Sequence, residues 1–181
     1  MKTLPMMSGV LFLAASGVAY GDDTVVFRAS LAGEQEVAGL VAPQPGVTTE
    51  TTGGFRLEFD SALTKAAFRL RVGDGVKVTQ AHLHCAPAGV NGQVVAFLFN
   101  VAPVPGPGGV DVDGLLAEGE LTNADIVPDV DFASDPACEK TIDNIASLRA
   151  AMLQGCIYVN VHTEANPSGE VRGQVIPQDD V

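Results

Sequence analysis

Three histidines are the residues of this chain best suited to chemistry, because His82, His84 and His162 are its only imidazoles. In Ala81-His82-Leu83-His84 apolar residues and histidines alternate. Side chains of a strand point alternately to its two faces, so both imidazoles leave one face while Leu83 enters the core. Two imidazoles about 7 Å apart along a strand can hold one metal ion when a neighbouring strand supplies a third donor.

The third donor is predicted to come from a second alternating segment, Cys156 to His162. Its apolar residues are expected to face the core, which places Tyr158, Asn160 and His162 together on the opposite, outward face. Three neutral nitrogen donors suit copper, with zinc as the second choice, and they leave a coordination position open for water or substrate. The sequence therefore predicts a metal site at His82, His84 and His162.

A competing interpretation gives these histidines a structural role only. In that case the imidazoles hydrogen-bond to backbone groups, to Asn160 or to Glu164, and orient loops. A His-x-His pair alone does not decide between the two interpretations.

Other constellations give little support to catalysis. The chain has no Gly-x-Ser-x-Gly, no phosphate-binding Gly-rich loop before a helix and no Cys-x-x-Cys, which disfavours hydrolase and redox-thiol functions. Arg172 is interpreted as a staple that pairs with Glu170 or an acidic loop. No catalytic residue is assigned, and isolated surface carboxylates are expected at Glu34, Glu36, Glu164 and Glu170.

Short β-branched and alternating segments separated by turn residues dominate the remaining sequence. A single helix is expected from Asp143 to Gln154, ended by Gly155. We predict a mostly β, single-domain antiparallel β-sandwich or Greek-key-like barrel with one short helix in a connection. A turn at Asp74-Gly75 is expected to separate two of the strands. The expected strands are Thr24 to Leu31, Gly54 to Phe59, Lys65 to Val72, Lys77 to His84, Gln93 to Asn100, Val110 to Leu121, Cys156 to His162 and Glu170 to Ile176.

The N-terminal segment, residues 1–21, has the anatomy of a signal peptide: a positive Lys2, an apolar stretch from Val10 to Ala15 and small residues up to Gly21. Cleavage leaves residues 22–181 as one domain that is secreted, periplasmic or held at the cell surface. No later segment is apolar enough for stable membrane insertion. The net charge of −12 repels nucleic acid, so a nucleic-acid partner is not expected.

Three cysteines, Cys85, Cys138 and Cys156, lie in the mature chain, and an exported protein meets conditions in which disulfides persist. Cys85 and Cys138 have polar, Pro-containing surroundings, whereas Cys156 opens an apolar strand. We therefore predict a Cys85–Cys138 bridge, with Cys156 as a small buried residue.

Five sequence blocks carry a resemblance to a known family: Leu31 to Val37, Ala81 to His84, Gly89 to Val95, Tyr158 to Thr163 and Pro167 to Gln174. Through them the chain resembles the CHRD domain, a module first described in chordin and found in exported bacterial proteins, over about Val26 to Ile176. This resemblance implies an immunoglobulin-like or barrel-like β fold in an extracellular setting, and it implies no settled activity.

The His-x-His pair with a distant third histidine also looks like the copper-ligand pattern of copper/zinc superoxide dismutases, although three histidines are too few for the complete two-metal site. Three functions stay open. The first is a module that binds copper or another transition metal. The second is a non-catalytic extracellular interaction or matrix module, with a protein partner at a strand face or at the loop from Val101 to Val110. The third is a copper-only, dismutase-like enzyme.

Overall fold

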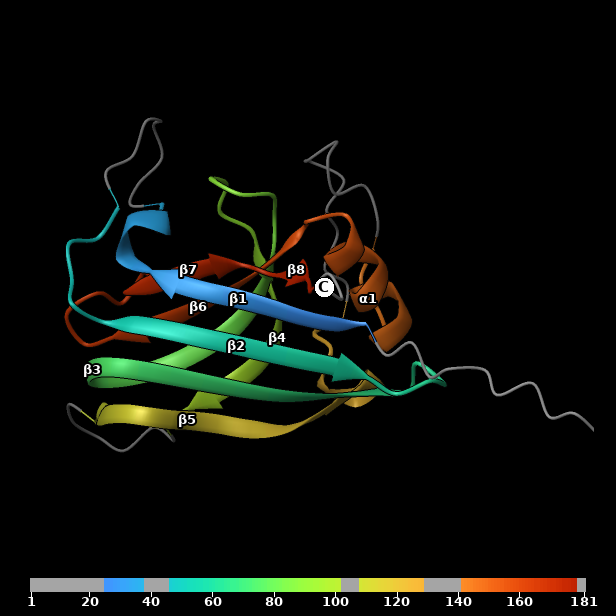
Figure 1. Ribbon diagram of the computed structural model, residues 1–181, viewed down its shortest axis with the longest axis horizontal. Helices are drawn as coiled ribbons and strands as arrows, with labels where there is room; N and C mark the ends of the chain where they lie inside the picture. The colour runs from blue at the N-terminus through green and yellow to red at the C-terminus, as the bar shows by residue number, and fades with distance from the viewer. Residues whose placement is uncertain (1–24, 38–45, 102–107, 129–140, 179–181) are drawn as a thin grey trace, which may run out of the picture.

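The computed structural model describes residues 25–37, 46–101, 108–128 and 141–178. The predicted signal peptide and Cys138 lie outside these ranges. Within them the chain is mostly β, as predicted, with one α-helix (Figure 1). The elements are β1 (Val26–Ala32), η1 (Gly33–Gln35), β2 (Thr52–Phe59), β3 (Lys65–Cys85), β4 (Gln93–Asn100), β5 (Val110–Thr122), η2 (Asn123–Asp125), α1 (Ile145–Leu153), β6 (Ile157–Thr163), β7 (Val171–Gln174) and β8 (Ile176–Pro177).

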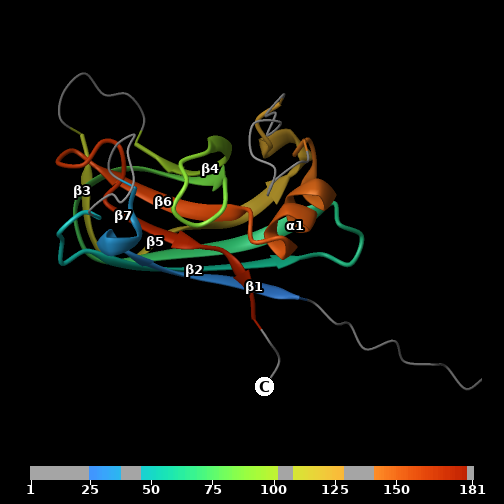
Figure 2. The ribbon, with the colours of Figure 1, turned by 90° about the horizontal axis from the view of Figure 1, so that it is seen from above.

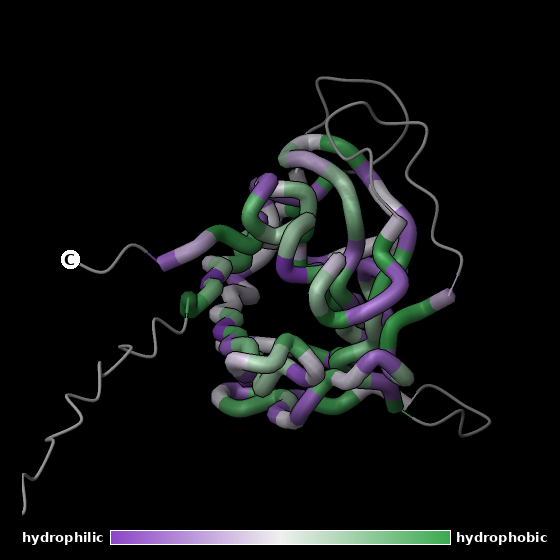
Figure 3. Tube along the Cα trace, turned by 90° about the vertical axis from the view of Figure 1, so that its right-hand side faces the viewer, coloured by the Kyte–Doolittle hydropathy of each residue, from purple (hydrophilic) through white to green (hydrophobic). Residues whose placement is uncertain are grey.

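One long strand, β3, closes the sheet into a barrel. The strands follow the order β2-β1-β7-β6-β3, and β3 also pairs with β2, so the sheet returns to its beginning. All strand pairs among the described residues are antiparallel. Strands β4 and β5 attach to β3 as extensions of the barrel, and β8 attaches to β1. Viewed from its end, the chain forms a ring of strands (Figure 3).

The predicted turn at Asp74-Gly75 is wrong, because β3 runs from Lys65 to Cys85 without a break. Its pairing register with β5 shifts around Gly75, and Asp74 has a φ of 52°. These are the features of a bulge, which bends a strand and increases its twist without ending it. The first half of β3 can therefore pair with β2 and the second half with β6.

The core lies inside this ring and is built from one face of each strand. In β3 and β6, Leu83, Val159 and Val161 are fully buried, as the alternating pattern predicts. Phe27 of β1 and Leu57 of β2 meet them from the other side of the barrel, in one contiguous apolar cluster. The sequence pattern therefore assigns the inner face of these strands correctly.

The helix α1 lies at one end of the barrel in both side and top views (Figures 1 and 2). Its first turn is capped by Asn144, whose side chain accepts a hydrogen bond from the backbone N–H of Ser147. Leu148 and Met152 are fully buried against the barrel core. Gly155 has a positive φ, the left-handed conformation that commonly ends a helix, and it ends α1 as predicted.

The cysteine prediction needs a correction. Cys156 is disulfide-bonded in the structure and is 1% exposed. With three cysteines in the chain, a bridge that includes Cys156 is incompatible with the predicted Cys85–Cys138 pair. Cys156 lies in the short connection between α1 and β6, so it was wrongly assigned to the strand itself.

The inner face of β2 provides a test of the core. Replacing the fully buried Leu57 by Ala removes apolar contacts and leaves a cavity, which we expect to lower the free energy of unfolding by about 2–5 kcal/mol. The matched control is Leu115→Ala, because Leu115 is 45% exposed. This control should be nearly as stable as the wild type, since a truncation at the surface leaves no cavity. Urea denaturation of both variants checks this, and equal losses would contradict the assignment of the core.

Candidate metal centre

The structure brings the three histidines together on neighbouring strands. His82 and His84 lie on β3, His162 lies on β6, and these two strands are paired, with His82 opposite Asn160 and His84 opposite Tyr158. One ring nitrogen from each histidine lies within 4.8 Å of the other two. This is the set of residues that the alternating sequence patterns placed on one face.

The face that carries the histidines is largely covered, contrary to the prediction, although His84 and His162 keep intermediate exposure. His82 is 5% exposed, and Tyr158 and Asn160 are 3% exposed. The connection between β3 and β4 and the turn between β6 and β7 both make hydrogen bonds to side chains of this face. Strand alternation reveals the face of a side chain but not the loops that cover it.

Two backbone carbonyls fix the tautomers of two histidines. The carbonyl of Gly92 lies 3.0 Å from Nδ1 of His84, and the carbonyl of Pro167 lies 3.0 Å from Nδ1 of His162. A carbonyl oxygen can only accept, so each Nδ1 must carry the proton and donate it. In the neutral rings both Nε2 atoms then keep a lone pair that is available to a metal ion.

His82 completes the cluster. Its Nδ1 lies 3.2 Å from Nε2 of His162, and its ring meets the exposed ring of Phe97 edge-on at 4.8 Å. Within the described residues, the buried Nε2 atoms of His82 and His84 have no hydrogen-bond partner. Buried polar atoms are rarely left without a partner, so these two point to a ligand or solvent.

The separation of 3.2 Å between these two nitrogens fits two chemical situations. In the metal-free protein, Nδ1 of His82 donates a hydrogen bond to the Nε2 lone pair of His162. Two imidazole nitrogens bound to one tetrahedral ion at about 2.0–2.1 Å would lie about 3.3 Å apart. The same separation of the two rings therefore suits both states, but in the metal-bound state the proton of His82 would have to move from Nδ1 to Nε2.

All three imidazoles are held in the neutral form. Burial lowers the pKa of His82 to about 4, and the neighbouring His162 and His84 lower it further. Burial also lowers the pKa of His84 to about 4, with contributions from His162 and from the positive charge of Arg172. Burial lowers the pKa of His162 in the same direction. Near neutral pH, protons therefore do not compete with a metal ion for these nitrogens.

Sequence reasoning missed three buried charged residues beside this cluster. Arg172, expected as a modest staple, is 2% exposed, and its guanidinium lies 3.4 Å from the centre of the Tyr158 ring. Glu36 and Glu170, expected at the surface, are each 6% exposed. Because Val171 faces the core, alternation could have placed Glu170 and Arg172 on the histidine face, but no sequence pattern reveals that this face is covered.

Glu36 is linked to the histidine face through Asn160, which lies opposite His82. It accepts a 2.6 Å hydrogen bond from Nδ2 of Asn160. Burial raises the pKa of Glu36 to about 7, against the lowering effects of Arg172, the Val37 N–H and Asn160. Gly169, at a φ of 141°, packs on this pair, and a Cβ atom there would lie 2.6 Å from both Asn160 and Glu36. Only glycine fits this position.

The remaining carboxylate and the predicted contact loop lie away from the cluster. Glu164, which was considered as a hydrogen-bond partner for the histidines, accepts instead from the backbone N–H of Gly109. Most of the loop from Val101 to Val110 lies outside the described residues, so its role as a partner surface stays a prediction.

These shifted pKa values predict opposing effects of pH on the stability of the metal-free protein. Histidines in the unfolded chain become protonated below about pH 6.5, whereas the buried His82 and His84 become protonated only near pH 4. Their contribution to stability is therefore lost as the pH falls from about 6.5 to about 4. Folded Glu36 holds a proton between pH 4.5 and about 7 that the unfolded chain releases, so its contribution is lost as the pH rises.

Glu36→Gln removes the opposing carboxyl group. We expect its free energy of unfolding to rise more steeply with pH between 4.5 and 6.5 than that of the wild type, in urea denaturation at a series of pH values. The exposed Glu120→Gln controls for the loss of one carboxylate. Parallel pH profiles for Glu36→Gln and the wild type would exclude the role assigned to Glu36.

Comparison with known proteins places this geometry in a family. No helix in the described part of the chain is long and apolar enough to cross a bilayer. No curated protein and no solved structure matches the chain. The family model of the CHRD domain matches residues 27–175, a range that includes every strand of the barrel from β1 to β7 except the first residue of β1 and that contains all three histidines. The chain therefore belongs to the CHRD domain family.

Proposed function

We propose that this chain is an exported CHRD module that binds one transition-metal ion, copper in the first place, through His82, His84 and His162. The observation that carries the proposal is the pair of fixed tautomers. Because Nδ1 of His84 and of His162 each donates to a backbone carbonyl, neither Nε2 carries a proton, and a metal ion can take both lone pairs, that of His162 in place of its hydrogen bond with His82. Metal-binding histidines in proteins typically make this second hydrogen bond, which orients the ring.

Three further properties support a metal ion over a purely structural cluster. The nitrogens lie close enough to share one ion, and the low pKa values keep them deprotonated. A structural cluster would also be expected to satisfy its buried nitrogens, yet two Nε2 atoms lack a partner among the described residues.

The donor set favours copper, with zinc as the second choice. Imidazole nitrogens suit both ions, whereas magnesium and calcium require oxygen ligands. Among divalent first-row ions, copper binds a given nitrogen site most tightly. A closed tetrahedral site has four protein donors, whereas this site offers three. Sites with three protein donors leave one coordination position open for a further ligand. We therefore propose a role in copper binding or storage, or in simple redox chemistry.

Export follows from the N-terminal sequence rather than from the barrel. Residues 1–21 have a charged start, an apolar stretch and small residues before the cleavage region. We propose that the mature module acts in the periplasm, at the cell surface or in the medium.

Titration of the metal-free mature chain with Cu(II), Cu(I) and Zn(II) tests the site. We expect one ion to bind per chain, tightest for copper, and we expect the combined His82→Ala, His84→Ala, His162→Ala variant to lose this binding. Gln80→Ala is the matched control, since Gln80 is exposed on the same strand, two residues before His82. Circular dichroism establishes that each variant is folded.

Absence of stoichiometric binding in the folded wild type would exclude the metal site. It would leave the non-catalytic interaction module as the remaining function, with the histidines as hydrogen-bonded structural residues. Stoichiometric binding that survives the triple substitution would place the metal elsewhere on this acidic chain.

A further inference from the structure

Two connections cover the histidine face, and each is held by a buried charged residue near the start of β7. The first connection, residues 86–92, joins β3 to β4, and the second, residues 164–170, joins β6 to β7. Glu170 and Arg172 are two residues apart, so they leave the barrel on the same side. That side is the one opposite Val171, which lies in the core.

Arg172 holds the first connection at three points. Its Nη2 donates to the carbonyl of Val90 at 2.7 Å and to that of Pro87 at 3.3 Å, and its Nη1 donates to the side chain of Asn91 at 3.1 Å. The guanidinium also stacks on the ring of Tyr158 at 3.4 Å. A buried arginine whose N–H groups donate to several backbone carbonyls fixes the path of that backbone.

The end of this connection determines the orientation of His84. The carbonyl of Gly92 accepts from Nδ1 of His84, and its N–H donates to the hydroxyl of Tyr158 at 3.1 Å. The rings of Tyr158 and His84 stack, with centroids 4.9 Å apart and an interplanar angle of 8°. Gly92 packs so closely that a Cβ atom would collide with the carbonyl of Cys85. Arg172, Tyr158 and Gly92 therefore hold His84 from two directions.

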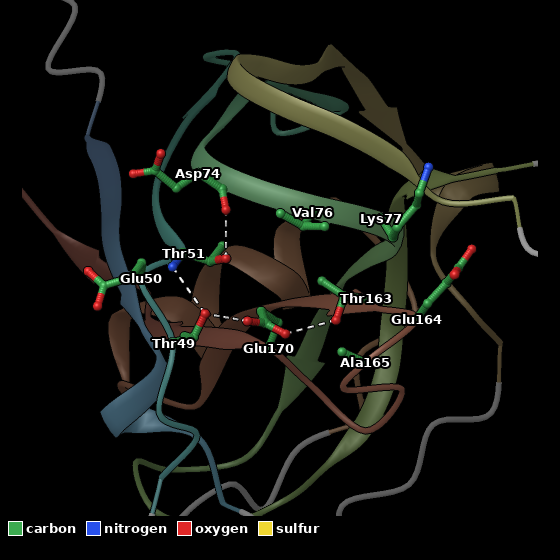
Figure 4. Close-up of a pocket in the computed structure, with 10 residues that line it drawn as sticks. All are labelled: Thr49, Glu50, Thr51, Asp74, Val76, Lys77, Thr163, Glu164, Ala165 and Glu170. Carbon is green, nitrogen blue, oxygen red and sulfur yellow. Dashed lines mark hydrogen bonds between the residues drawn. The ribbon is translucent and has the colours of Figure 1, made fainter.

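Glu170 holds the second connection in the same manner. Its carboxylate accepts hydrogen bonds from Thr163 Oγ1 at 2.8 Å, from Asn166 Nδ2 and from Thr49 Oγ1; Figure 4 shows it between the two threonines in a pocket of about 580 Å³. Burial raises the pKa of Glu170, but these hydrogen bonds outweigh burial and lower it, so the carboxylate is an anion near neutral pH.

The turn fixed by Glu170 carries the carbonyl that orients His162. Asn166 donates its backbone N–H to Thr163 Oγ1 at 3.0 Å and accepts from the N–H of Gly169 at 3.1 Å. Pro167 lies between these two anchored residues, and its carbonyl accepts from Nδ1 of His162. A displaced turn would remove that acceptor.

We propose that Glu170 and Arg172 are positioning residues, each of which fixes the Nδ1–H tautomer of one histidine: Glu170 that of His162, and Arg172 that of His84. Together they keep both Nε2 atoms unprotonated; that of His84 has no partner among the described residues, and that of His162 accepts only from Nδ1 of His82. The effect of these two residues on metal affinity rests on the function proposed above. The tautomers themselves are a property of the metal-free protein.

Long-range ¹H–¹⁵N correlation spectra of the metal-free protein test the proposal, because they distinguish the two neutral tautomers of each ring. The wild type is expected to show His84 and His162 as Nδ1–H. Arg172→Lys should shift His84 towards a mixture of tautomers and leave His162 unchanged, and Glu170→Gln should do the reverse. The matched controls are Arg69→Lys and Glu118→Gln, two members of an exposed ion pair, which should change neither ring.

Copper titration of the same variants measures the consequence. Loss of a residue that orients a metal ligand typically costs about 10- to 100-fold in affinity, and we expect a loss of this size for Arg172→Lys and for Glu170→Gln. Where either variant fails to fold, Asn91→Ala removes the side-chain contacts with Arg172 and with the Val37 carbonyl, and Asn166→Ala removes the contact with Glu170. Both should give smaller shifts with the same selectivity.

The outcomes separate this proposal from the metal site. Unchanged tautomers in folded Arg172→Lys and Glu170→Gln would overturn it even if the wild type binds copper. A shift of both histidines in either variant would also overturn it, because general loosening would then be the cause. If the variants show the selective tautomer shifts but neither they nor the wild type bind copper, the positioning roles are upheld and the proposed function is rejected.

Discussion

The architecture depends on β3, a strand of 21 residues that pairs with β2, β4, β5 and β6. A straight strand of this length could not serve both sides of a small barrel. The bulge around Gly75 bends it, so that its first half lies in one part of the wall and its second half in another. That bend brings His82 and His84 beside β6, and thereby beside His162. Barrel closure and the assembly of the histidine cluster are consequences of the same local departure from regular pairing.

Covering the histidine face creates a second constraint, because every polar group placed there must find a partner or remain unsatisfied. The chain meets this requirement with two buried charges that bond to loops rather than to each other. Arg172 donates to carbonyls of the first connection, and Glu170 accepts from the Asn166 amide of the second and from the hydroxyls of Thr163 and Thr49. His82 and His84 each have a partner at Nδ1 only, whereas His162 is hydrogen-bonded at both ring nitrogens. The unpartnered nitrogens of His82 and His84 mark the part of the cluster that is left for a ligand; among the described residues, Oδ1 of Asn160 and Oε1 of Gln174 also lack a partner.

The sequence predicts the inner and outer faces of β3 and β6 well, since alternation depends only on local geometry. His82, His84 and His162 were brought to one face by that rule alone. The rule fails where long-range packing decides: a turn was expected at Asp74-Gly75 because turns and bulges share the same residue types, and only the pairing with β5 distinguishes them. Burial of Glu36, Glu170 and Arg172 depends on connections folding over the sheet, and a disulfide that includes Cys156 depends on where α1 docks. Neither leaves a pattern in neighbouring residues.

The contrast between the acidic chain and its neutral site bears on what the site selects. A net charge of −12 attracts cations of every kind, and salt screens this attraction beyond about 8–10 Å. A site built from carboxylates would also bind calcium and magnesium, which prefer oxygen ligands. Instead, the donors that the cluster itself offers are imidazole nitrogens, although the neutral Oδ1 of Asn160, opposite His82, also lacks a partner among the described residues. Arg172 adds a positive charge close to His84. A cation gains from this site only if it bonds well to nitrogen, since the local charge does not favour it. The site then selects an ion by the strength of its coordination bonds to nitrogen rather than by electrostatic attraction. Copper and zinc form strong bonds to imidazole nitrogen, whereas the hard ions of the extracellular medium do not.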